Sequence, residues 1–241
     1  MNITIFYFSG TGNTKFVCDK FVEIMESKNS KVNLYNIEST RIDNNILDNT
    51  DIIGFAYPVH GADIPKIFKQ FIDTIPLNVR KNAFVLSTVG YINAYGPFIL
   101  KKLLSEYSIY LKWHYVFTAV NNTKNCTVTN ELLEESFVKQ KQKITKFCDS
   151  IIGNNKKIEG IGPWILGGYI VRHYIHHQIE NFYKVLYVDK ELCKYCYECI
   201  RNCPTKSIKY ENEQFKFNET CSTCYRCIKN CPVNAIKKGD A

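Results

Sequence analysis

The stretch NITIFYFSGTGNT, residues 2–14, decides the fold of the N-terminal part. Its apolar first half predicts a buried strand at residues 2–8, and a helix is predicted at 13–28. Between them lies Ser9–Thr14, a loop rich in glycine and hydroxyl groups. Free backbone N–H groups and the helix dipole at such a helix start favour a phosphate group. The stretch therefore predicts a strand, an anion-binding loop and a helix in succession.

The same alternation continues along the first 150 residues. It predicts an α/β fold in which helices wrap a five-stranded parallel sheet. The further strands are expected near residues 31–37, 51–57, 82–88 and 113–120, and the further helices near 63–75, 94–108 and 129–152. In a doubly wound sheet of the order 2-1-3-4-5, a ligand binds beyond the carboxyl ends of the strands, at the switch point between strands 1 and 3.

The loop at Ser9–Thr14 does not fit the common nucleotide motifs. It lacks the Gly-Lys-Ser/Thr ending of a Walker A loop, and the dinucleotide pattern G-x-G-x-x-G fails because Lys15 stands at its third glycine. What remains is a cradle in which hydroxyl groups can donate hydrogen bonds to a terminal phosphate and glycines allow close approach of the backbone. This loop resembles the phosphate-binding loop of flavodoxins.

The resemblance covers about residues 1–152. It implies a flavodoxin-like α/β fold, a doubly wound five-stranded parallel sheet in the order 2-1-3-4-5, and FMN as cofactor. It implies that the phosphate is held by the first loop and that the flavin ring is framed by residues 57–61 and 88–91, which follow the third and fourth strands. The implied FMN-binding residues are Ser9, Gly10, Thr11, Gly12, Asn13, Thr14, Tyr57, Pro58, Val59, His60, Gly61, Thr88, Val89, Gly90 and Tyr91.

Three side chains near the expected flavin ring have more than one interpretation. His60 could donate a hydrogen bond to the flavin or stabilise its anion, or it could be a solvent-exposed loop residue. Tyr57 and Tyr91 could stack on the ring or belong to the core or rim of the domain. Common flavodoxins have acidic flavin loops, whereas these loops carry His60 and few carboxylates.

Eight of the eleven cysteines lie between residues 193 and 231, in two runs of the form C-x2-C-x2-C-x3-C-P. This is the bacterial iron–sulfur pattern, in which three cysteines bind one cluster and the fourth binds the other. The pattern predicts one [4Fe-4S] cluster on Cys193, Cys196, Cys199 and Cys231, and a second on Cys221, Cys224, Cys227 and Cys203. Four-cysteine zinc sites and structural disulfides are the alternatives, but zinc sites use separated pairs and disulfides need an oxidising compartment.

The two cysteine runs are a repeat. Residues 193–210 and 221–238 are identical at ten of eighteen positions at an offset of 28, which indicates a duplicated module. Between the runs, alternation around residues 208–217 predicts a short hairpin. This segment resembles the two-cluster bacterial ferredoxins, and we expect a small α+β ferredoxin domain at residues 185–241.

Residues 154–184 are predicted to connect the two domains, with the flavodoxin-like domain ending at 153. The segment is rich in aromatic and aliphatic residues, and Ile170, Tyr174, His177 and Asn181 recur at helical spacing. This spacing suggests a segment packed between the domains. His173 and His177 share a helix face, but no carboxylate pair or cysteine accompanies them, so no metal site is assigned there.

Composition excludes several classes of protein. The formal net charge is +8, but no run of basic residues indicates nucleic-acid binding. No apolar run reaches the roughly 20 residues of a membrane span. The sequence shows no secretory signal at its N-terminus, so we expect a cytoplasmic protein.

The whole chain resembles the fused flavodoxin/ferredoxin proteins of anaerobic bacteria. The resemblance implies an electron-transfer protein that passes electrons between two [4Fe-4S] clusters, FMN and external redox partner proteins. Two alternatives remain: a ferredoxin-linked flavin reductase that acts on a small molecule at FMN near His60, and a redox-sensing module. We assign no catalytic acid, base or nucleophile. The sequence does not determine the donor, the acceptor, the reduction potentials or the oligomeric state.

Overall fold

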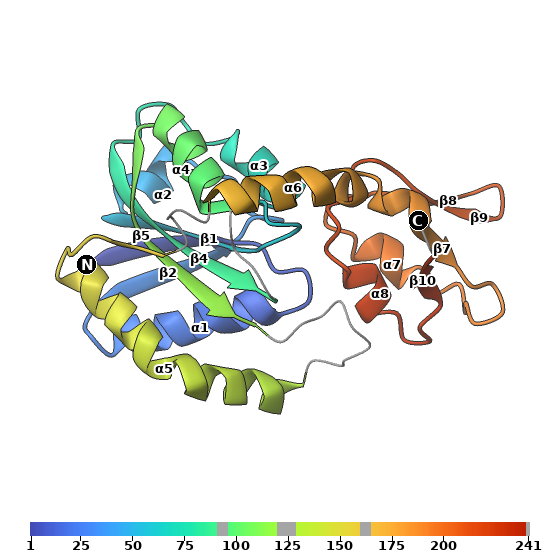
Figure 1. The fold of residues 1–241 in the computed structure, drawn as a ribbon, viewed down its shortest axis with the longest axis horizontal. Coiled ribbons are helices and arrows are strands. Elements are labelled where there is room, and N and C mark those ends of the chain that lie inside the picture. Colours follow the sequence, from blue (N-terminus) through green and yellow to red (C-terminus); the bar gives the residue numbers. More distant parts are fainter. Residues whose placement is uncertain (91–95, 120–128, 160–164, 240–241) are drawn as a thin grey trace.

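The structure is a computed structural model that describes residues 1–90, 96–119, 129–159 and 165–239. A larger N-terminal part and a smaller C-terminal part lie end to end, and the helix α6 runs along both (Figure 1). The elements in chain order are β1 (Asn2–Tyr7), α1 (Asn13–Glu26), β2 (Lys31–Asn36), α2 (Asn44–Asp48), β3 (Ile52–Pro58), α3 (Lys66–Ile72), β4 (Lys81–Val89), α4 (Gly96–Glu106), β5 (Ile109–Thr118), α5 (Asn130–Ile152), β6 (Lys157–Ile158), α6 (Ile165–Glu180), the 3-10 helix η1 (Phe182–Val185), β7 (Leu186–Val188), α7 (Glu198–Arg201), β8 (Ile208–Glu211), β9 (Gln214–Phe217), α8 (Arg226–Lys229) and β10 (Ile236–Lys238).

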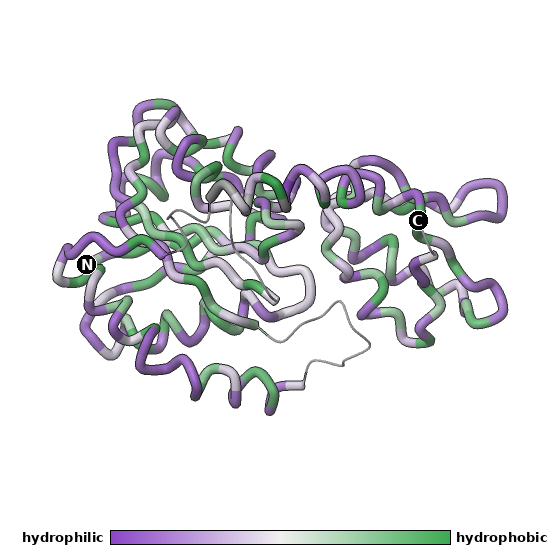
Figure 2. The backbone as a smooth tube through the Cα atoms, in the orientation of Figure 1, coloured by the Kyte–Doolittle hydropathy of each residue, from purple (hydrophilic) through white to green (hydrophobic). Residues whose placement is uncertain are grey.

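The N-terminal part is a parallel sheet with helices on both faces. Its strand order is β2-β1-β3-β4-β5-β6, which confirms the predicted doubly wound sheet and adds β6 at the edge. Apolar strands occupy the centre of this part, between helices of mixed polarity (Figure 2). The carboxyl ends of the strands point toward the C-terminal part (Figure 1), so the edge where a ligand is expected faces the cysteine-rich segment.

Alternation along β1 builds two separate cores. Ile3 and Ile5 pack with α1 and α5 on one face, whereas Phe6 and Phe8 pack with α3 and α4 on the other. Successive side chains of a strand point to opposite faces, so a strand covered on both sides is apolar throughout. This explains why residues 2–8 form an almost continuous apolar run.

The sheet differs from its prediction at one edge. β5 begins at Ile109 rather than at 113, because Ile109 and Leu111 already point into the core. The register of the pairing between β4 and β5 shifts between Ala83 and Phe84. Residues 157–158, which the sequence assigned to the connector, pair with β5 and extend the sheet.

The C-terminal part consists of short elements around the two cysteine runs. β7 pairs antiparallel with β10, and β8 pairs antiparallel with β9, which confirms the predicted hairpin at residues 208–217. The one-turn helices α7 and α8 occupy equivalent places in the two repeats. None of the helices in the described ranges is long and apolar enough to cross a membrane.

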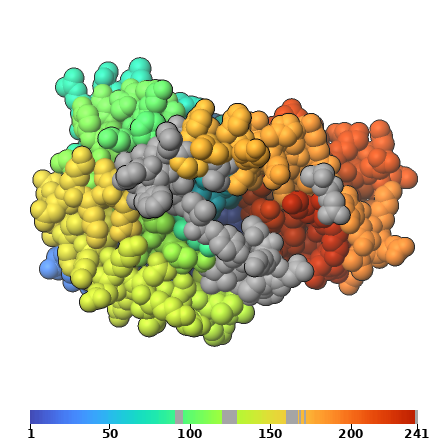
Figure 3. All heavy atoms as spheres, in the orientation of Figure 1, coloured from blue at the N-terminus to red at the C-terminus, as the bar shows by residue number. Residues whose placement is uncertain are grey.

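The helix α6 lies across the join between the two parts (Figure 3). Two of the residues noted at helical spacing, Ile170 and Tyr174, lie on its exposed face, at 56% and 80% exposure. The packed face carries Ile175 and Ile179 instead. A Cβ atom placed on Gly61 would lie 2.7 Å from Ile179 Cγ1 and 3.1 Å from Ile175 Cγ2, so these isoleucines lie against the loop after β3.

Candidate functional site

The loops after β1, β3 and β4 meet at one edge of the sheet. The hydroxyl groups of Thr14 and Thr88 are 2.8 Å apart and buried, and they join the first loop to the end of β4. The backbone N–H of Val59 donates to the carbonyl of Thr88 at 2.8 Å, which joins the loops after β3 and β4. The structure thus brings together the described residues of all three predicted flavin-binding segments.

The loop at Ser9–Thr14 is shaped to receive an anion. Ser9 Oγ accepts hydrogen bonds from the backbone N–H groups of Gly12 and Lys15, at 3.1 and 3.3 Å. Gly12 has a φ of +101°, which a residue with a Cβ rarely adopts. The first turn of α1 carries no acidic residue, so no fixed negative charge opposes a phosphate at this helix start. The loop therefore fits the phosphate of FMN.

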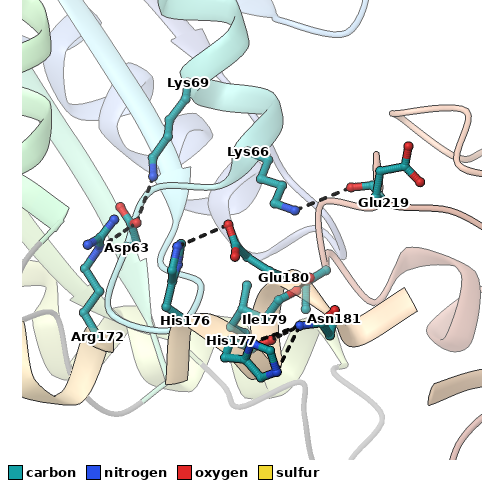
Figure 4. Close-up of polar contacts among 11 residues, drawn as sticks. Asp63, Lys66, Lys69, Arg172, His176, His177, Ile179, Glu180, Asn181 and Glu219 are labelled. Carbon is teal, nitrogen blue, oxygen red and sulfur yellow. Dashed lines mark hydrogen bonds and ion pairs between the residues drawn. The ribbon is translucent and has the colours of Figure 1, made fainter. Parts of the chain in front are cut away.

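The loop after β3 is a tight turn. His60 and Asp63 exchange two backbone hydrogen bonds of 3.0 Å, and both residues between them, Gly61 and Ala62, have a positive φ. The buried carboxylate of Asp63 accepts from Lys69 and Arg172, both at 2.8 Å, so α3 and α6 are tied to this turn (Figure 4). Because a buried carboxylate is stable only when it is paired, this network fixes the turn in place.

The residues predicted to surround the flavin ring differ in their burial. The Tyr57 side chain is fully buried and packs against Phe68, with ring centroids 5.1 Å apart, so only its backbone faces the loop edge. Thr88 and Val89 are buried at the end of β4, and Gly90 is exposed. Tyr91 lies outside the described residues.

His60 contacts the C-terminal part directly. Its Nδ1 lies 3.0 Å from the carbonyl oxygen of Ser222, which can only accept, so Nδ1 carries the hydrogen. Burial lowers the pKa of His60 to about 4, although the bond to Ser222 acts in the opposite direction. His60 is therefore neutral at pH 7, and it is a contact between the two parts rather than a free loop residue.

The cysteines of the two runs line two cavities. Each cavity is lined by the first three cysteines of one run and the fourth cysteine of the other. The cavity nearer the sheet, which we call the inner cavity, is lined by Cys221, Cys224, Cys227 and Cys203. The outer cavity is lined by Cys193, Cys196, Cys199 and Cys231. We call residues 221–227 the inner loop and residues 193–199 the outer loop. The grouping is the one expected from the C-x2-C-x2-C-x3-C-P pattern.

The fourth cysteine of each run receives the same hydrogen bond. The backbone N–H of Ser207 donates to Cys203 Sγ at 3.3 Å, and that of Ala235 donates to Cys231 Sγ at 3.2 Å. Burial alone would raise the pKa of Cys203, yet hydrogen bonds from Ser207 and Thr205 hold this pKa below its usual value. These bonds favour the thiolate, which is the form that binds iron.

The thiols of the inner loop need a positive partner. Burial raises the pKa of Cys224 to about 11, and it also raises the pKa of Cys227. A thiolate at such a position is stable only next to a compensating charge. Iron ions supply that charge, so the crossed cysteine groups fit iron–sulfur clusters.

The inner loop is packed against two of the predicted flavin-binding loops. A Cβ atom placed on Gly10 would lie only 2.5 Å from the carbonyl oxygen of Cys224, so the two backbones touch at this glycine. Ser222 and Thr223 are buried, at 4% and 2% exposure, and Thr223 Oγ1 donates to the carbonyl of Ile179 in α6. The inner cavity therefore lies beside both the phosphate loop and the turn at His60.

The residues that join the two parts were missed by the sequence analysis. The Arg226 guanidinium of the inner loop forms an ion pair with Glu38, which follows β2, at 2.6 Å. One signal was present in the repeat, because Arg226 corresponds at the offset of 28 to Glu198 of the outer loop. A reversal of charge within a duplicated module indicates that its two halves face different surroundings.

A flavodoxin domain model matches residues 4–147, more than half of the chain. The chain belongs to the flavodoxin family. A 4Fe-4S dicluster domain model matches residues 185–233, so the flavodoxin domain is followed by a ferredoxin-like part. The combination is that of a flavodoxin/ferredoxin fusion. A comparison with curated proteins found no match.

Several solved structures are similar to the flavodoxin part. The two-electron reduced flavodoxin of Megasphaera elsdenii has 16% identity and a TM-score of 0.44, and covers 57% of this chain and 98% of its own. Flavodoxin 1 of Bacillus cereus has 18% identity and a TM-score of 0.43, and covers 64% and 98%. The rubredoxin oxygen:oxidoreductase of Desulfovibrio gigas has 13% identity and a TM-score of 0.46, and covers 64% and 36%.

The two family matches define the general activity. A flavodoxin domain implies FMN, and a 4Fe-4S dicluster domain implies iron–sulfur clusters. Both groups exchange electrons with partners. The chain is therefore an electron-transfer flavo-iron–sulfur protein.

Proposed function

We propose that this protein passes electrons between FMN and two [4Fe-4S] clusters, and from these to external redox proteins. When bound, FMN takes up one or two electrons and a [4Fe-4S] cluster takes up one, so the combination connects one-electron and two-electron chemistry. The chain contributes the binding loops and fixes their relative positions. We divide it into a flavodoxin domain at 1–153, a connector at 154–184 whose residues 157–158 add the edge strand β6 to the flavodoxin sheet, and a ferredoxin domain at 185–241.

The proposed FMN site uses the three loops at the carboxyl edge of the sheet. Ser9, Gly10, Thr11, Gly12, Asn13 and Thr14 hold the phosphate through hydroxyl groups and backbone N–H groups. The backbones of residues 57–61 and 88–91 frame the ring. The side chain of Tyr57 is left out of this proposal, because it packs in the core against Phe68.

The proposed cluster ligands follow the two cavities. Cys221, Cys224, Cys227 and Cys203 hold the inner cluster, and Cys193, Cys196, Cys199 and Cys231 hold the outer cluster. The cavities support this crossing because each is lined by three cysteines of one run and the fourth cysteine of the other.

The observation that carries the proposal is the contact of the inner loop with two of the three proposed flavin-binding loops. Cys224 abuts Gly10 of the phosphate loop, and Ser222 accepts from His60 of the ring loop. Electron tunnelling slows steeply with distance, so the inner cluster is the one placed to exchange electrons with FMN. Cys196 of the outer loop is exposed, and this loop is the side from which a redox partner would be reached.

The experiment is a stepwise reduction of anaerobically purified protein, followed by its absorption spectrum. Iron and acid-extracted flavin are quantified on the same sample. We expect flavin bands over a broad thiolate-to-iron band, with about eight iron and about one FMN per chain. Iron without flavin, even after incubation with FMN, would contradict the proposal.

A further inference from the structure

The guanidinium of Arg226 donates hydrogen bonds to the backbone of the phosphate loop. Its Nη2 donates to the carbonyl of Ser9 at 2.8 Å, and its Nε donates to the carbonyl of Gly10 at 3.0 Å. These are two successive peptide groups of the loop proposed to bind the FMN phosphate. The contact therefore joins the inner loop of the ferredoxin part to the backbone of the flavin site.

The guanidinium is held in this orientation by Glu38. Nη1 and Nη2 donate to the two carboxylate oxygens of Glu38, at 2.7 and 2.6 Å. The two side chains are only 16% and 18% exposed. A two-pronged arginine–carboxylate pair of this kind is both strong and directional, and it gives Arg226 little freedom to turn away from Ser9 and Gly10.

Arg226 is also tied to the inner cavity from both cysteine runs. It stands between Cys224 and Cys227, and its Nη1 donates at 3.2 Å to the carbonyl of Asn202, which precedes Cys203. The position of its guanidinium thus depends on the segments that carry all four cysteines of the inner cavity. An ordered inner cluster would hold these segments together.

The carbonyl contacts determine where the N–H groups of the phosphate loop point. In a planar trans peptide the N–H points to the side opposite the C=O. Fixing the carbonyls of Ser9 and Gly10 toward Arg226 directs the N–H groups of Gly10 and Thr11 away from the ferredoxin part. In a phosphate-binding loop those are the groups that an anion binds.

We propose that Arg226 is a positioning residue for FMN: it holds the Ser9 and Gly10 carbonyls so that the phosphate loop presents its N–H groups to the flavin phosphate. The ferredoxin part therefore completes the flavin site, and FMN affinity depends on the docked inner loop. By linkage, FMN binding stabilises the docked ferredoxin part to the same extent. This inference rests on the proposed binding of FMN at Ser9–Thr14.

The test is a fluorescence titration of FMN into full-length, cluster-loaded, flavin-depleted protein under anaerobic conditions. Riboflavin, which has the same ring and no phosphate, is titrated in parallel. We expect R226Q to weaken FMN binding at least about tenfold, as for the loss of one partner of a buried charge pair, and to leave riboflavin binding unchanged. R226K keeps the charge but cannot hold two carbonyls and two carboxylate oxygens at once, so it should give an intermediate loss.

The matched control is R201Q. Arg201 lies beside the outer loop and donates to the carbonyl of Cys196 at 2.8 Å, but its ion pair is with Glu198 of the same loop. R201Q should bind FMN as the unaltered protein does. Iron content is measured for every variant, and if R226Q loads less iron, the comparison is decided with R226K.

Two results would overturn the inference while leaving the proposed function intact. One is unaltered FMN binding in both Arg226 variants. The other is an equal loss of FMN and riboflavin affinity, which would indicate general damage to the site instead of positioning of the phosphate loop. Failure of the unaltered protein to bind FMN would overturn the proposed function as well.

Discussion

The inner and outer cysteine loops have the same spacing but different surroundings. At equivalent positions of the repeat, the outer loop has Lys194 and Tyr195, which are exposed, whereas the inner loop has Ser222 and Thr223, which are 4% and 2% exposed. The cysteines keep the spacing of the proposed cluster ligands in both halves. The residues between them determine which half faces the flavodoxin domain.

The charged residues show the same division. Glu198 of the outer loop pairs with Arg201, three residues further along the same segment, and both side chains are well exposed. Arg226 occupies the equivalent position of the inner loop and pairs with Glu38 of the flavodoxin domain. A surface pair of the first kind adds little stability, whereas loss of one partner from a buried pair is costly. The inner half of the repeat is therefore specialised for contact with the flavodoxin domain, whereas the charged pair of the outer half lies at the surface.

The largest effect is expected from removing the fourth cysteine of each run. Cys203→Ala should lose the inner cluster and Cys231→Ala the outer one, so each variant should contain about four iron per chain in place of about eight. Because the inner loop contacts the flavin site, Cys203→Ala should also weaken FMN binding, and Cys231→Ala should not. Iron analysis and FMN titration check both expectations. Weaker FMN binding in Cys231→Ala alone would reverse the assignment of inner and outer.

The second prediction exchanges residues between equivalent positions. Ser222→Lys places an ammonium group in a buried contact, at a cost of several kcal/mol, and should separate the two parts. Lys194→Ser changes an exposed residue and should alter stability by less than about 0.5 kcal/mol. Limited proteolysis between the two parts measures the separation. If both variants are cleaved at the rate of the unaltered protein, the inner loop is not a docking surface.

The third prediction concerns the closest backbone contact. Gly10→Ala would place a Cβ 2.5 Å from the carbonyl oxygen of Cys224, and this overpacking should cost about 1–3 kcal/mol. Gly167→Ala is the matched control in α6. Among the described residues, apart from the chain neighbours and the helix's own backbone, no atom lies within 4 Å of the added Cβ, so this change should be neutral or slightly stabilising. Thermal unfolding of FMN-loaded protein compares them. Equal midpoints for the two variants would contradict the contact.

The smallest effect is a pH dependence carried by His60. Its pKa is about 4 in the docked structure and about 6.5 when it is free, so the docked form binds fewer protons in this interval. The contact between the two parts should therefore be fully stable above pH 6.5. Its free energy should weaken as the pH falls toward 4, by up to about 1.4 kcal/mol for each pH unit. Proteolysis at pH 7 and pH 5.5 measures the change.

His60→Asn should flatten this dependence. His114 has a similarly lowered pKa, but it is buried within the sheet, with Nε2 2.8 Å from Ser87 Oγ, and it contributes to unfolding of the flavodoxin domain instead. Proteolysis between the parts separates the two contributions. An unchanged pH dependence in His60→Asn would show that the docking contact at Ser222 is not sensitive to this histidine.

Much of the fold could be predicted because it depends on local patterns. The strand, loop and helix at residues 2–28 follow from apolar runs and a glycine-rich turn, and the crossing of the cysteines follows from their spacing. The face of α6 could not be predicted in this way. Ile170 and Tyr174 have the same spacing as a packed stripe, and only the position of Gly61 shows that Ile175 and Ile179 lie inside.

The joint between the domains was beyond sequence patterns for a related reason. Glu38 and Arg226 are 188 residues apart. The repeat marks Arg226 as different from Glu198, but no pattern in the sequence identifies Glu38 as its partner. Tyr57 shows the opposite error. As a tyrosine at the end of a strand it fitted the pattern expected beside a flavin ring, but its side chain packs in the core against Phe68. Contacts between distant segments depend on how folded domains pack against each other. The periodicity of a sequence describes only the elements within each domain.

The most direct test of the account is the transfer of electrons from flavin to iron in Cys231→Ala, which should keep only the inner cluster. Flavin is reduced by a light flash with an external photoreductant under anaerobic conditions, and cluster absorbance is followed in time. We predict fast first-order transfer with a rate independent of protein concentration, as in the unaltered protein. Absence of transfer, or a rate proportional to protein concentration, would contradict the claim that the inner cluster is the one held at the flavin site.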